Sequence, residues 1–243
     1  MKNKIKIFRK LVRCASIALL SFSMAGCGAD FLDTTPTNNI SGSSIWTKAT
    51  LAEQAVIGVY NVFLEYCPNS GILDSHRIPW DAYSSVMDTD KNWIKRMPNC
   101  TGAATPSSGL FSDIYKRFYT FIYRANDVID NIGQVPDMST GEKQRAIAEC
   151  KFLRAFAYMR LNILYKGVPL YMNAITSPEN GNKARSSEAD VWAAVLQDLT
   201  DCVNEPNLPG KYNSGDSNYG RVTKGAAYAL RGQVYMWRKN WEA

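Results

Sequence analysis

One long helix constrains the fold of this chain more than any other feature. Between Glu149 and Leu170 the apolar residues recur at three- and four-residue steps, which places them on one face of an amphipathic helix. They are Leu153, Phe156, Ala157, Leu161 and Leu164, joined by the aromatic residues Phe152, Tyr158 and Tyr165. A face this wide needs neighbours on more than one side. We therefore predict a central core helix that does no chemistry itself.

The local sequence predicts where this helix begins and ends. Ser139, followed three residues later by Glu142, matches a capping box, in which each residue binds a free backbone N–H of the first turn. Gly167 and Pro169 should end the helix. Gly accepts the left-handed backbone that closes a helix, and Pro cannot continue one.

Two further helices are expected before the central one. Thr50 and Glu53 form a second capping pattern, and apolar residues then follow a helical spacing until about Cys67. Residues 109–132 show the same spacing, and Gly133 is the expected cap. Within this second helix, Asn126 is expected to form a structural hydrogen bond to a neighbouring helix and not to bind a ligand.

Two helices are also expected after the central one. Ser187 with Asp190 opens one, and Thr223 is the expected cap of the other. The last helix resembles the first helix of a tetratricopeptide repeat in the placing of four residues, Tyr228, Gly232, Tyr235 and Trp241. The predicted fold is therefore mostly α-helical, with tetratricopeptide-like helical pairs and long irregular loops.

The amino terminus has the pattern of an export sequence. Six Lys and Arg residues precede an apolar run over 14–25, which is shorter than the roughly 20 residues that a membrane-spanning helix needs. Met24-Ala-Gly-Cys27 resembles a bacterial lipobox, so we expect residues 1–26 to be a lipoprotein signal peptide and Cys27 to be lipidated. Acyl chains on Cys27 would anchor the protein to a membrane without crossing it. The alternative is a plain signal peptide with an incidental Cys.

Charge outside the export sequence argues against a nucleic-acid partner. The formal net charge is +6, but residues 1–26 hold six basic residues and no acid, which leaves 22 basic and 22 acidic residues in the remainder. Nucleic-acid binding needs a basic patch or stripe. Residues 27–45 are rich in Thr, Asn, Ser and Gly and are expected to form an extended tether, followed by a helical domain over 46–243.

The candidate binding residues lie in a long segment, 69–108, that lacks a helical period. Loops of this length inside a compact domain are uncommon and usually functional. A sugar has flat apolar faces edged with hydroxyls, so its site needs an exposed aromatic ring beside polar groups. The candidate glycan-binding residues are Trp80, Asp88, Asp90, Asn92, Trp93 and Arg96. The alternative is that the two tryptophans only pin the loop to the helices.

Several stretches share their pattern with one known family. They are Glu149-x-Lys-Phe-Leu-Arg-Ala-Phe-Ala-Tyr158 with Leu164-Tyr-Lys-Gly-Val-Pro-Leu170, then Arg221-Val-Thr-Lys-Gly-Ala-Ala227, and Cys27-x-x-Asp-Phe-Leu-Asp-x-x-Pro36. On these residues the chain resembles the SusD/RagB family of outer-membrane glycan-binding lipoproteins. The Thr-Asp pair at 89–90 with the aromatic Trp93 is similar to a motif of that family that stacks on glycan.

The resemblance implies a function and a partner. It implies capture of an oligosaccharide at the exterior face of the outer membrane and its delivery to a SusC-like TonB-dependent transporter. It covers nearly all 243 residues but only about the first half of a SusD-like chain. We therefore expect the domain over 46–243 to be incomplete, with its C-terminal half missing.

Four cysteines remain after Cys14 leaves with the signal peptide and Cys27 takes lipid. Disulfides can persist in an exported protein. A bridge between Cys67 and Cys100 would hold the long loop closed. Cys150 and Cys202 lie on helical faces and are expected to be buried small apolar residues.

Patterns that indicate catalysis, a metal or a cofactor are mostly absent from the sequence. The single histidine is His76, and no HExxH, CxxC or Gly-rich phosphate loop occurs. Asp88 and Asp90 could imitate the acid pair of a glycosidase. We therefore expect a non-enzymatic binding protein without cofactor or metal. A lipoprotein scaffold that binds only protein and a glycoside hydrolase are the alternatives.

Overall fold

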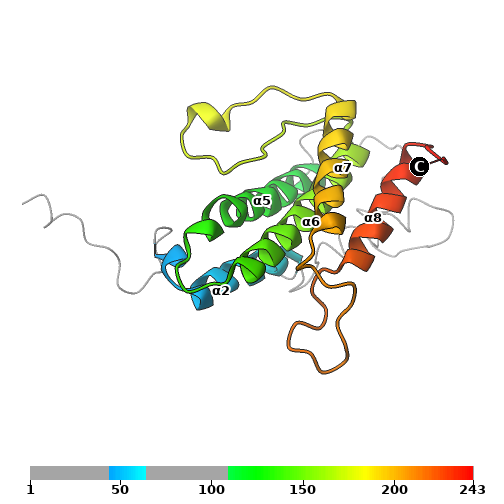
Figure 1. Cartoon of the computed structure of the whole chain (residues 1–243). Helices are drawn as coiled ribbons and strands as arrows, with labels where there is room; N and C mark the ends of the chain where they lie inside the picture. The colour runs from blue at the N-terminus through cyan, green and yellow to red at the C-terminus, as the bar shows by residue number, and fades with distance from the viewer. Residues whose placement is uncertain (1–43, 64–108, 243) are drawn as a thin grey trace, which may run out of the picture. The chain divides into compact units, whose positions relative to one another are not determined.

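The computed structural model describes residues 44–63 and 109–242 (Figure 1). These residues form five α-helices: α2 (Ala49–Tyr60), α5 (Gly109–Asn131), α6 (Thr140–Tyr165), α7 (Glu188–Asn204) and α8 (Lys224–Trp237). Short 3-10 turns are η2 (Ile45–Thr47), η3 (Asn61–Phe63), η4 (Ile132–Gln134) and η5 (Glu179–Gly181). No strand occurs within these two ranges. The predicted mostly α-helical fold of tetratricopeptide-like pairs is confirmed.

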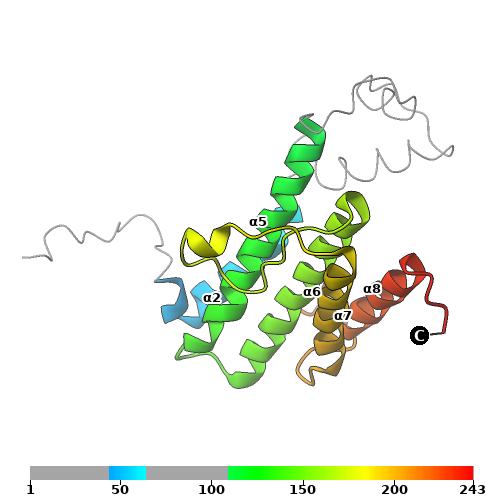
Figure 2. The same cartoon turned by 90° about the horizontal axis from the view of Figure 1, so that it is seen from above.

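The central helix is α6, as its sequence predicts. It packs against α2, α5, α7 and α8, and side chains on all sides of it are buried, among them Cys150, Leu153, Tyr158 and Leu161. Figure 2 shows α5 and α6 side by side and running in opposite directions, joined by the short connection 132–139. Because much of α6 is enclosed, its buried polar side chains, Glu149, Arg154 and Asn162, need hydrogen-bond partners within the protein.

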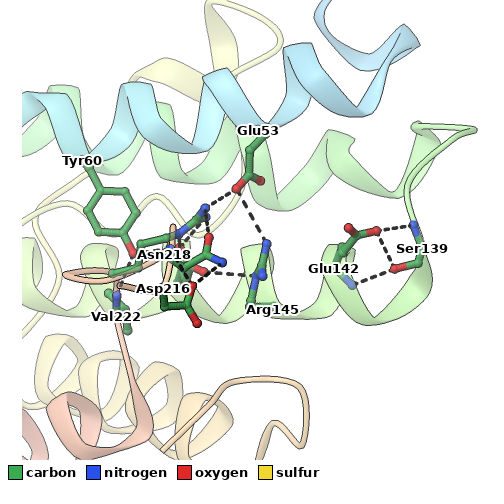
Figure 3. A network of polar contacts seen from close by, with 10 residues as sticks. Glu53, Tyr60, Ser139, Glu142, Arg145, Asp216, Asn218 and Val222 are labelled. Carbon is green, nitrogen blue, oxygen red and sulfur yellow. Dashed lines mark hydrogen bonds and ion pairs between the residues drawn. The ribbon is translucent and has the colours of Figure 1, made fainter. Parts of the chain in front are cut away.

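Both ends of α6 follow the local sequence. Ser139 Oγ accepts a hydrogen bond from the Glu142 backbone N–H at 3.3 Å, and Glu142 Oε2 accepts one from the Ser139 backbone N–H at 2.9 Å (Figure 3). At the other end Lys166 and Gly167 both have positive φ, 57° and 85°. A Cβ on Gly167 would lie 2.5 Å from the Ser186 carbonyl oxygen, so only Gly fits there.

The predicted caps of α7 and α8 are also confirmed. Ser187 Oγ accepts from the Asp190 backbone N–H at 3.1 Å, and Thr223 Oγ1 accepts from the Ala226 backbone N–H at 3.2 Å. Each cap satisfies one of the free N–H groups that every helix start leaves.

Two predicted helix limits are wrong. The N-cap of α2 is Lys48, without a side-chain cap, and the Ala49 N–H instead donates to Asp137 Oδ1 at 2.7 Å. Thr50 lies inside the first turn of α2 and is not its N-cap, and the Glu53 carboxylate pairs with Arg221. At the end of α5 the chain tightens into η4, so Gly133 lies inside a 3-10 turn and does not adopt the left-handed backbone of a C-cap.

Helix α8 buries one face only. Ala227, Leu230 and Val234 are buried, and α8 contacts α7 and α6. Four large apolar side chains at this end of the chain are more than half exposed, namely Tyr228, Met236, Trp237 and Trp241. Among the described helices, none combines the length and the apolar character needed to cross a membrane.

The two described cysteines are buried free thiols, as predicted. Cys202 Sγ donates a hydrogen bond to the Ala148 carbonyl oxygen at 3.1 Å. Burial raises the pKa of the Cys202 thiol to about 12 and also raises that of Cys150. Both therefore stay protonated and act as packing groups. Cys67 and Cys100 lie outside the described residues, and a bridge between them stays a hypothesis.

The capping assignments can be tested with a matched pair of variants. Ser139→Ala should lower the free energy of unfolding by about 1 kcal/mol, because the N–H of Glu142 loses its acceptor. Thr50→Ala should change it by less than about 0.5 kcal/mol, because Thr50 is exposed and caps nothing. Urea denaturation followed by circular dichroism measures both. Equal losses in the two variants would contradict the assignment.

Candidate functional site

The glycan-binding residues predicted from the sequence are not among the described residues. Trp80, Asp88, Asp90, Asn92, Trp93 and Arg96 all fall within 64–108, and the lipidation residue Cys27 falls within 1–43. Their roles stay predictions.

A pocket of about 490 Å³ lies beside α5 in the described part of the chain. We call it the α5 pocket. Its walls come from α5 and from the segment that follows α6, and the lining residues are Tyr115, Lys116, Tyr119, Thr120, Ile122, Tyr123, Asn126, Tyr171, Asn173 and Ile175. Figures 1 and 2 show that the loop between α6 and α7, to which Tyr171, Asn173 and Ile175 belong, lies over α5.

The tyrosines of the α5 pocket share one side of α5 because of their spacing. Tyr115, Tyr119 and Tyr123 are four residues apart, and residues at that separation are neighbours along a helix. A different stripe of α5, which includes Phe118, Phe121 and Ala125, is fully buried in the core. The helix therefore uses one stripe for folding and presents tyrosines along another.

The second wall, residues 169–174, is irregular backbone held by side chains of α5 and α6. Tyr119 Oη donates to the Pro169 carbonyl at 2.8 Å, and Asn126 Nδ2 donates to the Tyr171 carbonyl at 2.7 Å. The hydroxyl of Tyr158 accepts from the Tyr171 N–H at 2.6 Å. Asp130 accepts from the Ala174 N–H at 2.7 Å. These bonds substitute for the regular ladder that the segment lacks.

Arg154 links this wall to α7. Arg154 is 3% exposed, and its guanidinium donates two hydrogen bonds to the Asp198 carboxylate, at 2.8 and 2.7 Å. Nη1 also donates to Asn126 Oδ1 at 2.6 Å and to the Met172 carbonyl at 2.7 Å. Burial alone would lower the pKa of Arg154, but the hydrogen bonds and charge of Asp198 hold it above its ordinary value. The structural role predicted for Asn126 is confirmed.

The rings of the α5 pocket are fixed against one another. The Tyr115 and Tyr119 ring centroids are 4.7 Å apart, and Tyr171 meets Tyr119 edge-on at 5.9 Å. The Tyr171 hydroxyl donates to the Gly181 carbonyl at 2.8 Å. Burial raises the pKa of Tyr119, so its hydroxyl stays neutral. Because the hydroxyls of Tyr119 and Tyr171 are used within the fold, these residues offer a ligand mainly their ring surfaces.

A second polar network lies around Glu149, which is completely buried on α6. Tyr60 Oη donates to Glu149 Oε2 at 2.8 Å, and Arg221 Nε donates to the same oxygen at 2.9 Å. The Tyr60 hydroxyl also accepts from the Val222 N–H at 3.0 Å (Figure 3). Burial raises the pKa of Glu149, and Arg221, Tyr60 and Arg145 act in the opposite direction. The network joins α2, α6 and the residues just before α8.

Glu53 completes this network from α2. Its carboxylate pairs with Arg221 and lies 3.7 Å from Arg145 Nη2 (Figure 3). Glu53, Tyr60, Glu149 and Arg221 each bond to a residue of another element, so the arrangement indicates structural support. Glu53 Oε2 is buried without a hydrogen-bond partner. Within residues 44–63 and 109–242, no group of three or more His, Cys, Asp and Glu side chains could hold a metal ion.

Sequence reasoning missed the α5 pocket. It predicted a helix over 109–132 and gave no binding role to the pocket residues Tyr115, Tyr119, Tyr123, Tyr171 and Asn173. The sequence signal that could have indicated the pocket was a tyrosine at every fourth position of the helix predicted over 109–132. The second wall could not be foreseen, since its path depends on side chains from two other helices.

The chain is similar in sequence to proteins of one known family. A family model, SusD-like, described as starch-binding and associating with the outer membrane, matches residues 30–236. The chain is 25% identical over 233 residues to SusD-like protein P25 of Formosa agariphila, covering 92% of this chain and 42% of that protein. It is 27% identical over 241 residues to a SusD-like protein of Bacteroides ovatus, covering 96% and 40%. The chain spans about two fifths of the length of these relatives.

Solved structures give the same similarity. A SusD-like protein of Bacteroides fragilis has a TM-score of 0.65 and 26% identity, over 86% of this chain and 39% of that one. A laminarin-binding SusD-like protein has a TM-score of 0.68 and 27% identity, over 79% and 41%.

The structural weight of the Arg154–Asp198 pair can be compared with that of a surface pair on the same two helices. Asp198→Ala should lower the free energy of unfolding by about 3–5 kcal/mol, because it leaves a buried guanidinium unpaired. Asp201→Ala removes the partly exposed Lys151–Asp201 pair, whose N–O distance is 2.6 Å, and should cost less than about 1 kcal/mol. Thermal and urea unfolding measure both. A loss in Asp198→Ala no larger than that in Asp201→Ala would contradict the central role of the pair.

Proposed function

This chain belongs to the SusD-like family, and we propose that it is a cell-surface lipoprotein that captures glycan fragments and passes them to a SusC-like TonB-dependent transporter. The observation that carries the proposal is the match of a starch-binding, outer-membrane family model to residues 30–236. The laminarin-binding relative supports a polysaccharide fragment as the class of ligand. We infer a binding role without catalysis, because the family is described by binding.

In this proposal the segment 69–108 supplies the main sugar contacts. Trp80 and Trp93 would stack on sugar faces, while Asp88, Asp90, Asn92 and Arg96 would bond to hydroxyls. The affinity of one such site should be modest, because an exposed sugar site gives up many water contacts.

Attachment follows from the amino terminus in the same proposal. Residues 1–26 direct export, Cys27 carries the acyl chains, and residues 27–45 tether the helical domain. This arrangement keeps the protein at the outer membrane beside its transporter partner while leaving the binding surface in water.

Glycan binding can be tested on the complete chain with single tryptophan variants. We expect the wild type to bind at least one polysaccharide of a plant and host glycan panel. Trp80→Ala and Trp93→Ala should each raise Kd about tenfold, since each removes a stacking ring. Trp241→Ala is the control, because Trp241 is 73% exposed and lies outside the proposed segment. Isothermal titration calorimetry gives the three Kd values.

Three results would contradict the proposal. Failure of the wild type to bind any glycan would favour a scaffold that binds only protein. Unchanged affinity in both tryptophan variants would remove the assignment to residues 69–108. Release of shortened glycan products would favour a glycoside hydrolase.

Lipidation can be tested by comparing the wild type with a Cys27→Ala variant. Wild-type protein expressed in a bacterium with a lipoprotein pathway should partition into the membrane fraction, and mass spectrometry should find an acylated N-terminal peptide beginning at Cys27. Cys27→Ala should lose both properties. Recovery of unmodified wild-type protein in the cytosol would contradict the proposed anchor and location.

A further inference from the structure

The α5 pocket has the surface chemistry of a sugar-binding site. Four tyrosines line it together with the polar residues Lys116, Thr120 and Asn173. Sugar rings have apolar C–H faces that pack on aromatic faces and hydroxyl edges that bond to amides, hydroxyls and ammonium groups. Its volume of about 490 Å³ falls within the range of roughly 300–1,000 Å³ that is typical of small-molecule sites.

The spacing of the tyrosines suits a chain of sugars. Tyr115, Tyr119 and Tyr123 follow one another at four-residue steps, which is a rise of about 6 Å along a helix. That rise is comparable to the advance of one sugar ring along an oligosaccharide. The Tyr115 and Tyr119 centroids are 4.7 Å apart. The three tyrosines therefore form a row along α5 that can contact consecutive sugars.

The site is also formed in advance of any ligand. Asn126, Tyr119 and Tyr158 each bond to the backbone of the 169–174 wall, at distances of 2.6–2.8 Å. A wall that is already ordered loses little conformational entropy on binding. Tyr123 lies at the exposed lip of the pocket with 53% of its surface accessible, so a ligand would cover a ring that now faces water.

We propose that the α5 pocket is a second glycan-contact site, in which the row Tyr115–Tyr119–Tyr123 stacks on consecutive sugar rings and Lys116 and Asn173 bond to their hydroxyls. This inference rests on the proposed glycan-binding function, and it adds a contact surface built only from described residues. Two contact sites on one chain would bind a long glycan more tightly than a short one, because the second contact becomes intramolecular.

Chemical footprinting tests the site directly with an internal control. Tyrosine nitration of the complete chain would be quantified by mass spectrometry, with and without oligosaccharides prepared from laminarin, starch, xylan and mannan. Tyr123 and Tyr228 are both 53% exposed and both lie on helices, so they should be nitrated to similar extents in the free protein. A bound oligosaccharide should protect Tyr123 several-fold and leave Tyr228 unchanged.

A matched pair of variants supplies the second measurement. Tyr123→Ala should raise Kd for a long oligosaccharide about tenfold, and Tyr228→Ala should leave it unchanged. Unaltered thermal midpoints would show that both variants are folded, as expected for side chains that are half exposed.

The outcomes separate this inference from the function on which it rests. Protection of Tyr123 together with the selective loss in Tyr123→Ala supports the second site. Glycan binding that depends on Trp80 or Trp93 but leaves Tyr123 unprotected overturns the second site and keeps the proposed function. Absence of any glycan binding by the wild type overturns both.

Discussion

The buried ion pair between Arg154 and Asp198 is the interaction on which the arrangement of the other elements depends. A guanidinium inside a protein is costly unless its donors are satisfied, so its surroundings must supply acceptors. They come from the Asp198 carboxylate on α7, the Asn126 amide oxygen on α5 and the Met172 carbonyl. One side chain of α6 therefore holds two helices and an irregular segment together. That segment is a wall of the α5 pocket, which connects the core to the surface that can meet a ligand.

A second buried charge on the same helix acts in the same way toward other elements. Glu149 accepts hydrogen bonds from Tyr60 on α2 and from Arg221, which lies just before α8. Arg221 also pairs with Glu53. Glu149, Arg154 and Arg221 all fall in the stretches by which the chain resembles its family. Their contacts show that these signature residues organise the fold.

The accuracy of sequence reasoning depended on how local each feature is. The caps at Ser139, Ser187 and Thr223 were predictable, because the capping oxygen and the backbone N–H that donates to it are only three residues apart. The capping box predicted for Thr50 and Glu53 is not formed. Lys48 is the N-cap of α2, and Glu53 bonds instead to Arg221, which is 168 residues away in sequence. The α5 pocket was missed for a related reason. Helical spacing showed that Tyr115 lies on a helix but not which element lies across from it.

The sequence by itself determined the helical class, the central position of α6 and most helix ends, because periodicity and capping depend on residues within one or two turns. Only the tertiary structure decided which partners the buried charges take and how the 169–174 segment runs over α5. Those features depend on contacts between residues distant in the chain, such as Arg154 with Asp198 and Asn126 with Tyr171. No local pattern specifies them, since many arrangements of the same helices would satisfy the same periodicity.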